Sequence, residues 1–180
     1  MRSTTEADAT GDVAAKATVR RIRPTDTARM RALRLEMLAD SPLAFLETLA
    51  EAAARPHPEF AARVAEAADG ARIGQFVAEA EGRLVGHLGG MVAHDDPTTT
   101  VLFAVYITPS WRGRGLLGDL VEAAAAWSRE VGRSRLMLEV ASGNGRALRA
   151  YRRLGFAVFG TPVAHPKIPG LTEVWMRRPA

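Results

Sequence analysis

The pattern of hydrophobic and polar positions divides this chain into helical and extended segments. In residues 113–131, apolar side chains recur at intervals of three and four, which predicts a helix with one buried face; they are Leu117, Leu120, Val121, Ala124, Trp127 and Val131. Residues 135–140 instead alternate, so that Leu136, Leu138 and Val140 share one side, as in a half-buried strand. The chain therefore combines both kinds of element.

The remaining elements follow from the same signals together with turn residues. Glu81 and Gly82 predict the turn of a β-hairpin between two extended runs. Strands are predicted at 17–23, 73–79, 83–92, 100–108, 156–160 and 173–177, and helices at 24–38, 59–68 and 144–154. This order predicts an α/β fold of the mixed, α+β type, with helices on both faces of a sheet.

Length and composition are those of an ordinary globular domain. We expect one domain over residues 18–180 and a disordered tail over residues 1–17, which mix small and polar residues without a period. The chain has no cysteine, which excludes disulfides and thiolate catalysis. No apolar run approaches the roughly 20 residues of a membrane span, and the N-terminus lacks a signal-peptide core, so we expect a cytoplasmic location and no membrane contact.

Positive charge is concentrated in one part of the sequence. Residues 111–153 hold nine arginines against four acids, whereas the whole chain has a net charge of +4. One interpretation is a solvated arginine-rich surface, and the other is an attractive field for an anion. No segment carries the basic patch interleaved with aromatics that nucleic-acid binding predicts, so we expect a phosphorylated cofactor and no nucleic acid.

A glycine-rich run stands between a predicted strand and a predicted helix. Glycine lets the backbone approach a phosphate closely, and the helix N-terminus adds partial positive charge. We therefore expect the main-chain amides of this run to bind a diphosphate; the run comprises Arg112, Gly113, Arg114, Gly115, Leu116, Leu117 and Gly118.

The same glycines also match the G-x-G-x-x-G pattern of dinucleotide-binding folds, and Glu139 follows at a suitable distance. In that fold the first glycine directly follows the strand, but here residues 109–112 intervene. The 62 residues after Gly118 are also too few for the rest of a doubly wound sheet. A nicotinamide-dependent oxidoreductase is therefore the weaker interpretation.

Two motifs together resemble those of a known family. Arg112 and Gly115, preceded by a strand that ends at 105–109, resemble the pyrophosphate-binding motif of the GNAT superfamily of acetyl-CoA-dependent N-acetyltransferases. The segment from Asn144 to Phe156 resembles the motif that follows in that superfamily, and the likeness extends over about residues 18–178. It implies a central, mostly antiparallel twisted sheet of about seven strands and acetyl-CoA as co-substrate.

The resemblance also implies how the cofactor is held. The backbone of Val105, Tyr106 and Ile107 would pair with the pantetheine arm, and the Ile107 N–H would stabilise the oxyanion. The family usually has glycine or alanine where this chain has Leu117. Because Leu117 lies on the apolar stripe, we expect its side chain to point into the core while its amide still faces phosphate.

Tyr151 is the candidate general acid, which would protonate the departing thiolate. It stands two helical turns after Asn144 on the stripe shared with Ala147 and Leu154. Without the resemblance, Tyr151 would equally be a core aromatic. Asn144 is expected to contact the cofactor, and it is also a candidate helix N-cap.

The general base is less well defined by the sequence. Glu139 projects from the strand on the face opposite Leu138, and it precedes Asn144 by five residues, where the family's ribosomal-protein N-terminal acetyltransferases have their catalytic glutamate. The alternative is a solvent-facing carboxylate. Glu79 and Glu81 are weaker candidates, and a water could relay the proton to any of them.

The acceptor is expected to be a small-molecule amine or a protein or peptide N-terminus. Phe45 is a candidate for the wall of the acceptor pocket, as is the loop His94–Asp96.

The four histidines are dispersed without the spacing of metal ligands, so we expect them at the surface or in loops and expect no metal. Without cysteine or an activated serine, transfer would be direct, in a ternary complex. The alternative function is that of a non-catalytic acyl-CoA-binding module of the same fold.

Residues 173–177 are a candidate interface for a homodimer.

Overall fold

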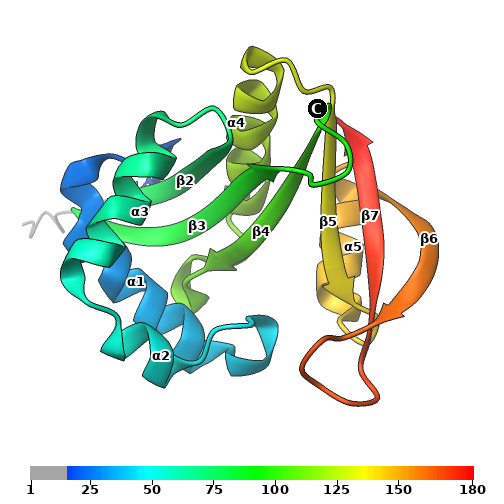
Figure 1. Ribbon diagram of the computed structural model, residues 1–180, viewed down its shortest axis with the longest axis horizontal. Coiled ribbons are helices and arrows are strands. Elements are labelled where there is room, and N and C mark those ends of the chain that lie inside the picture. Colours follow the sequence, from blue (N-terminus) through cyan, green and yellow to red (C-terminus); the bar gives the residue numbers. More distant parts are fainter. Residues whose placement is uncertain (1–15) are drawn as a thin grey trace, which may run out of the picture.

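The structure is a computed structural model that describes residues 16–180, and it is built around one sheet (Figure 1). Within these residues the sheet has seven strands in the order β1-β2-β3-β4-β5-β7-β6, and all neighbours are antiparallel except β4 and β5. The strands are β1 (Thr18–Arg21), β2 (Ile73–Ala80), β3 (Arg83–Val92), β4 (Thr99–Ile107), β5 (Arg135–Ala141), β6 (Ala157–Ala164) and β7 (Thr172–Pro179). The helices are α1 (Thr27–Asp40), α2 (Leu49–Ala54), α3 (His57–Asp69), α4 (Leu116–Glu130) and α5 (Gly145–Arg153).

This architecture confirms the predicted fold class and removes the dinucleotide-binding alternative, because a doubly wound sheet is mostly parallel. Several details differ from the prediction. The short helix α2 was not predicted, and α4 begins at Leu116 rather than at residue 113. Residues 1–15 of the predicted tail lie outside the described residues, whereas Ala17 packs against a small apolar cluster.

The helices form two layers that cover opposite faces of the sheet (Figure 1). On one face, α4 and α5 pack on the larger core cluster, which contains Leu120, Trp127, Leu138 and Tyr151. On the other, α1 and α3 bury a second cluster around Met30, Phe60, Val77 and Tyr106. Each apolar face predicted from periodicity is buried in this way, and burial of such side chains stabilises a fold by about 1.5–3 kcal/mol each.

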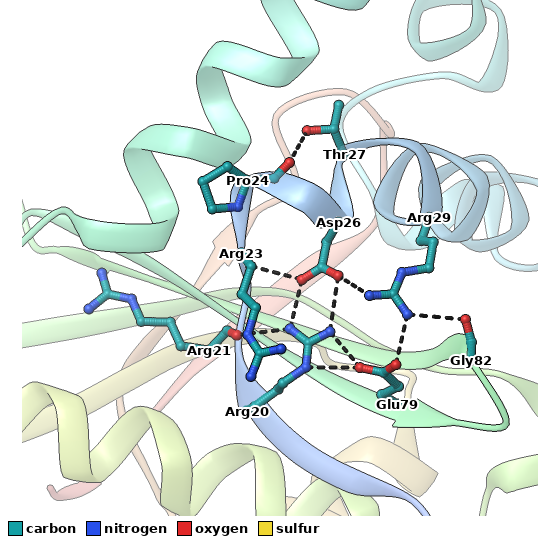
Figure 2. Close-up of polar contacts among 9 residues, drawn as sticks. All are labelled: Arg20, Arg21, Arg23, Pro24, Asp26, Thr27, Arg29, Glu79 and Gly82. Carbon is teal, nitrogen blue, oxygen red and sulfur yellow. Dashed lines mark hydrogen bonds and ion pairs between the residues drawn. The ribbon is translucent and has the colours of Figure 1, made fainter.

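A network of ion pairs joins β1, the start of α1 and β2 (Figure 2). The fully buried carboxylate of Asp26 accepts hydrogen bonds from Arg20 at 2.7 Å, from the backbone N–H of Arg23 at 2.8 Å, and from Arg29. Glu79 receives the same two guanidinium groups, with Arg29 at 2.7 Å. Hydrogen bonds from Arg20 above all lower the pKa of Asp26 to about 2. Glu79 is therefore part of this structural network.

The sheet order bears on the predicted homodimer through residues 173–177, which stays a prediction. β7 lies between β5 and β6 and pairs with both, so it has no free edge for a second chain. In the described residues, β1 and β6 are the edge strands. Among the helices that the structure describes, none is long and apolar enough to cross a membrane.

Candidate active site

The central feature of the site is the divergence of β4 from β5. The two strands pair only through Thr99–Val101 and Arg135–Met137, and then separate, as Figure 1 shows. A cleft of about 590 Å³ opens between Leu102–Val105 on one side and Leu138–Ala141 on the other. Backbone groups of both strands that would otherwise pair with each other are therefore available to a ligand in this cleft.

A bulge in β4 shapes the wall of the cleft. Ala104 has a φ of +49°, and the register with β3 shifts by one residue between the pairs His87–Tyr106 and Gly89–Phe103. As a result, Leu102 packs in the core cluster beneath α4, whereas Tyr106 packs in the cluster beneath α1. Regular alternation would place both side chains on one face, because they are four residues apart. The bulge thus reverses which face of the sheet the side chains at the end of β4 point to.

The turn between β4 and α4 presents free main-chain amides. In the part of the chain that the structure describes, the N–H groups of residues 113–117 have no hydrogen-bond partner. Gly113 and Gly115 adopt φ values of +80° and +86°, which favour glycine and let successive amides converge. The amides of Arg112 and Gly118 are instead used by the carbonyls of Pro109 and Gly115. This narrows the predicted set of phosphate-binding amides from 112–118 to 113–117.

Arg112 and Leu117 of this turn contact other parts of the protein, whereas Arg114 is exposed. Arg112 Nε donates to the carbonyl of Ile107 at 2.8 Å, its guanidinium pairs with Asp40, and it lies over the Tyr106 ring. Leu117 packs against the larger core cluster, as expected from the apolar stripe. The guanidinium of Arg114 lies over the ring of Trp111, 4.7 Å from its centroid. The chemistry that this turn can offer a diphosphate therefore comes chiefly from its backbone.

Tyr151 and Asn144 both line the cleft from α5. Asn144 caps this helix, because its side chain accepts a hydrogen bond from the Ala147 N–H at 3.0 Å. Tyr151 packs edge-on against Phe156 and is 8% exposed. Burial raises the pKa of the Tyr151 phenol above its ordinary value, so this group holds its proton at neutral pH. A protonated phenol at the cleft wall can donate a proton or a hydrogen bond.

Glu139 lines the same cleft from β5, on the face opposite Leu138. Partial burial, together with repulsion from the Glu173 carboxylate, raises the pKa of Glu139 above its ordinary value. A carboxylate with a raised pKa is a stronger base when ionised, which suits proton abstraction from an ammonium group. Of the weaker base candidates, Glu79 is held by Arg20 and Arg29 and does not line the cleft.

Several residues of the cleft were not predicted. Ser41–Ala44 line it on one side, His165 and Leu171 line it from the loop between β6 and β7, and Glu173 lines it from β7. Phe45 had been predicted as a wall residue on the strength of the resemblance, and the cleft does include it. The others carry no local signal, because their position depends on how distant loops meet.

Two predictions about histidines are wrong. His87 is neither at the surface nor in a loop: it lies on β3 and is 2% exposed. The loop His94–Asp96 does not border the cleft, because it precedes the paired end of β4, where Asp96 bonds to Thr98, Thr99 and Arg135. Residues 16–180 contain no cluster of three or more side chains suited to hold a metal ion.

Comparison with known proteins is consistent with this fold and site. The family model described as Acetyltransferase (GNAT) family matches residues 36–156. The mycothiol acetyltransferase of Propionibacterium freudenreichii subsp. shermanii is 32% identical over 152 residues, which cover 79% of this chain and 48% of that protein. The chain thus spans about half the length of this curated relative.

Solved structures share the architecture at low sequence identity. A GNAT-family acetyltransferase of Streptococcus pneumoniae superposes with a TM-score of 0.77 at 19% identity, covering 91% of this chain and 99% of that one. The yncA protein of Salmonella typhimurium, solved with its cofactor acetyl-CoA, has a TM-score of 0.73 at 20% identity and covers 91% and 93% of the two chains. This chain belongs to the acetyltransferase (GNAT) family.

Proposed function

We propose that this chain transfers an acetyl group from acetyl-CoA to a primary amine within a ternary complex. The observation that carries the proposal is the cleft between β4 and β5, which has Tyr151 and Glu139 in its walls. It opens beside β4, and the chain continues from that strand through Pro109–Trp111 into the turn with free amides at 113–117. The proposal is also supported by family membership.

The residues of this chain suit the binding of acetyl-CoA. Five consecutive amides before and within the first turn of α4 have no partner among the described residues, and such free N–H groups at a helix N-terminus are of the kind that binds phosphate. The unpaired edge of β4, including Val105, would accept the pantetheine arm as if it were another strand. Asn144, at the N-terminus of α5, would add a contact to the cofactor from the cleft wall.

The reaction requires one bond to form and one to break. The amine nitrogen attacks the thioester carbon after Glu139, directly or through a water, removes a proton from the ammonium group. The Ile107 N–H would stabilise the negative charge on the carbonyl oxygen. The nitrogen of the resulting intermediate then loses its second proton to solvent, the carbon–sulfur bond breaks, the thiolate takes the proton of Tyr151, and the tyrosine regains a proton from solvent. The products are the acetylated amine, coenzyme A and one released proton.

Two experiments test the proposal. Calorimetry should show binding of acetyl-CoA and not of NAD. An assay of thiol release with a panel of small amines and peptides with free N-termini should then reveal turnover and indicate the acceptor class. Binding without turnover for any acceptor would instead support the non-catalytic acyl-CoA-binding module. Absence of acetyl-CoA binding would overturn both.

A further inference from the structure

A second, inner cavity of about 150 Å³ lies on the other side of β4 from the core beneath α4. It is enclosed by α1, α3 and the strands β2 to β4. An outer cavity of about 410 Å³ shares Arg34, Glu47, Phe103 and Ala104 with it. The outer cavity also shares Phe45 and Glu139 with the cleft. The three spaces are therefore neighbours that share wall residues, from the candidate base to the inner cavity.

His87 offers the inner cavity a hydrogen-bond acceptor with a fixed orientation. Its Nδ1 lies 2.7 Å from the carbonyl oxygen of Ala104. A carbonyl can only accept, so Nδ1 carries the hydrogen and Nε2 of the neutral ring is an acceptor. Nε2 is buried and has no partner among the described residues. Burial lowers the pKa of His87 to about 4, which keeps the ring neutral at physiological pH.

Gln75 adds a second unpartnered group to the same wall. Its side-chain oxygen is buried and without a hydrogen bond in the described part of the chain. The residue stands two positions before Val77, which pairs with His87, so Gln75 and His87 face the same side of the sheet. A buried acceptor without a donor is unfavourable by about 1–3 kcal/mol, so a donor group bound in this cavity would gain a favourable partner.

The cations around the cavity already have carboxylate partners. Arg34 and Arg55 both pair with Glu47, and Arg55 and Arg63 both pair with Glu59. The three guanidinium groups outnumber these two carboxylates by one, so a second ammonium group on the acceptor would be repelled here. One buried oxygen of Glu47 also has no hydrogen bond within the described residues, although it pairs with Arg55. A neutral donor therefore suits this cavity better than a second cation.

We propose that the inner cavity binds the distal end of the amine acceptor, and that this end carries a neutral hydrogen-bond donor, a hydroxyl or an amide N–H, received by His87 Nε2 and Gln75. This inference rests on the proposed function, because it describes the acceptor of the acetyl transfer proposed above. The amine end would lie near Glu139, and the chain between the two ends would pass Phe45 and Phe103.

The kinetic test compares two series of acceptors of graded length. ω-Hydroxyalkylamines are matched with n-alkylamines in which a methyl group replaces the hydroxyl. The wild-type protein should prefer the hydroxylated member of the best pair by about tenfold in kcat/KM. Gln75→Leu should bring this ratio close to one while the KM for acetyl-CoA stays unchanged. His87→Phe should also bring the ratio close to one. Ser128→Ala, which removes a buried hydrogen bond on the opposite face of the sheet, should keep the preference.

A binding measurement separates this inference from the proposed function. In ¹⁵N spectra of the imidazole groups, a saturating ω-hydroxyalkylamine should shift the Nε2 signal of His87, and the matched n-alkylamine should not. This shift is expected whether or not acetyl transfer occurs. An unchanged Nε2 signal, or an unchanged acceptor ratio in a folded Gln75→Leu variant, overturns the inference and leaves a cavity that holds only water.

Discussion

Arg112 donates a hydrogen bond of 2.8 Å from Nε to the carbonyl of Ile107, and this contact ties the turn after β4 to the last residue of that strand. The proposed oxyanion donor and the proposed phosphate-binding amides are thereby held in one rigid unit. Asp40 of α1 secures the far side of the same guanidinium. Arg112 therefore acts as a positioning residue for the turn.

Replacement of Arg112 should weaken acetyl-CoA binding without abolishing the fold. Arg112→Ala removes the contacts with Ile107 and Asp40, so the amides at 113–117 lose their fixed orientation, and we expect about a tenfold higher Kd by calorimetry. Arg129→Ala is the charge-matched control, because Arg129 is exposed at the other end of α4. Equal effects of the two substitutions would indicate a mere change in net charge.

The positive φ of Gly115 makes it sensitive to any side chain. Gly115→Ala should destabilise the protein by about 1–2 kcal/mol and raise the Kd for acetyl-CoA at least about tenfold, since the turn must change shape. Gly132→Ala is a matched control: its φ is +79°, and a Cβ there would likewise meet open space, but it follows the far end of α4. The control should lower thermal stability comparably and leave cofactor binding intact.

Tyr151→Phe should separate catalysis from binding. The substitution keeps the edge-on packing against Phe156 but removes the proton donor, so kcat should fall by about 100-fold or more. The Kd for acetyl-CoA and the melting temperature should change little. Full turnover in this variant would assign Tyr151 a packing role only.

The raised pKa of Glu139 predicts a pH dependence. As a base, Glu139 acts only when ionised, so kcat/KM should rise with pH and level off above a value higher than that of an ordinary glutamate. Glu139→Gln should lose this rising limb and most of the rate. If the Glu139→Gln variant kept the same rise of kcat/KM with pH, the titrating group would be another base or the amine group of the acceptor.

The network around Asp26 predicts the acid sensitivity of the fold. The pKa of Asp26 is lowered to about 2 in the folded state, so its ion pairs stabilise the protein above the ordinary aspartate pKa of about 4. This stabilisation should be lost as the pH falls from about 4 toward 2. Asp26→Asn should lower the free energy of unfolding at neutral pH by about 2 kcal/mol or more in urea titrations, and should flatten the acid dependence. An unchanged profile would locate acid unfolding elsewhere.

Local patterns in the sequence determined the elements of this fold and part of its site. Recurrence at three and four placed Leu120, Val121 and Trp127 in the core, and the alternation in β5 placed Leu138 inward and Glu139 outward. These features depend on neighbours along one helix or strand, so periodicity reveals them. The glycine-rich run likewise predicted a close approach of the backbone to a ligand, because the conformational freedom of glycine is a property of the residue itself, although the helix was expected to begin at residue 113 rather than at Leu116.

The tertiary structure alone decided where these elements meet. No glycine in the sequence marks the bulge at Ala104. The bulge accompanies a register shift against β3, and as a result the side chains of Tyr106 and Leu102 point to opposite helix layers. His87 became buried because α1 and α3 cover its face of the sheet, and the pairing of Arg34 with Glu47 depends on the path of the chain between α1 and α2. Such contacts join residues far apart in sequence, and no local period encodes which distant groups will pack together.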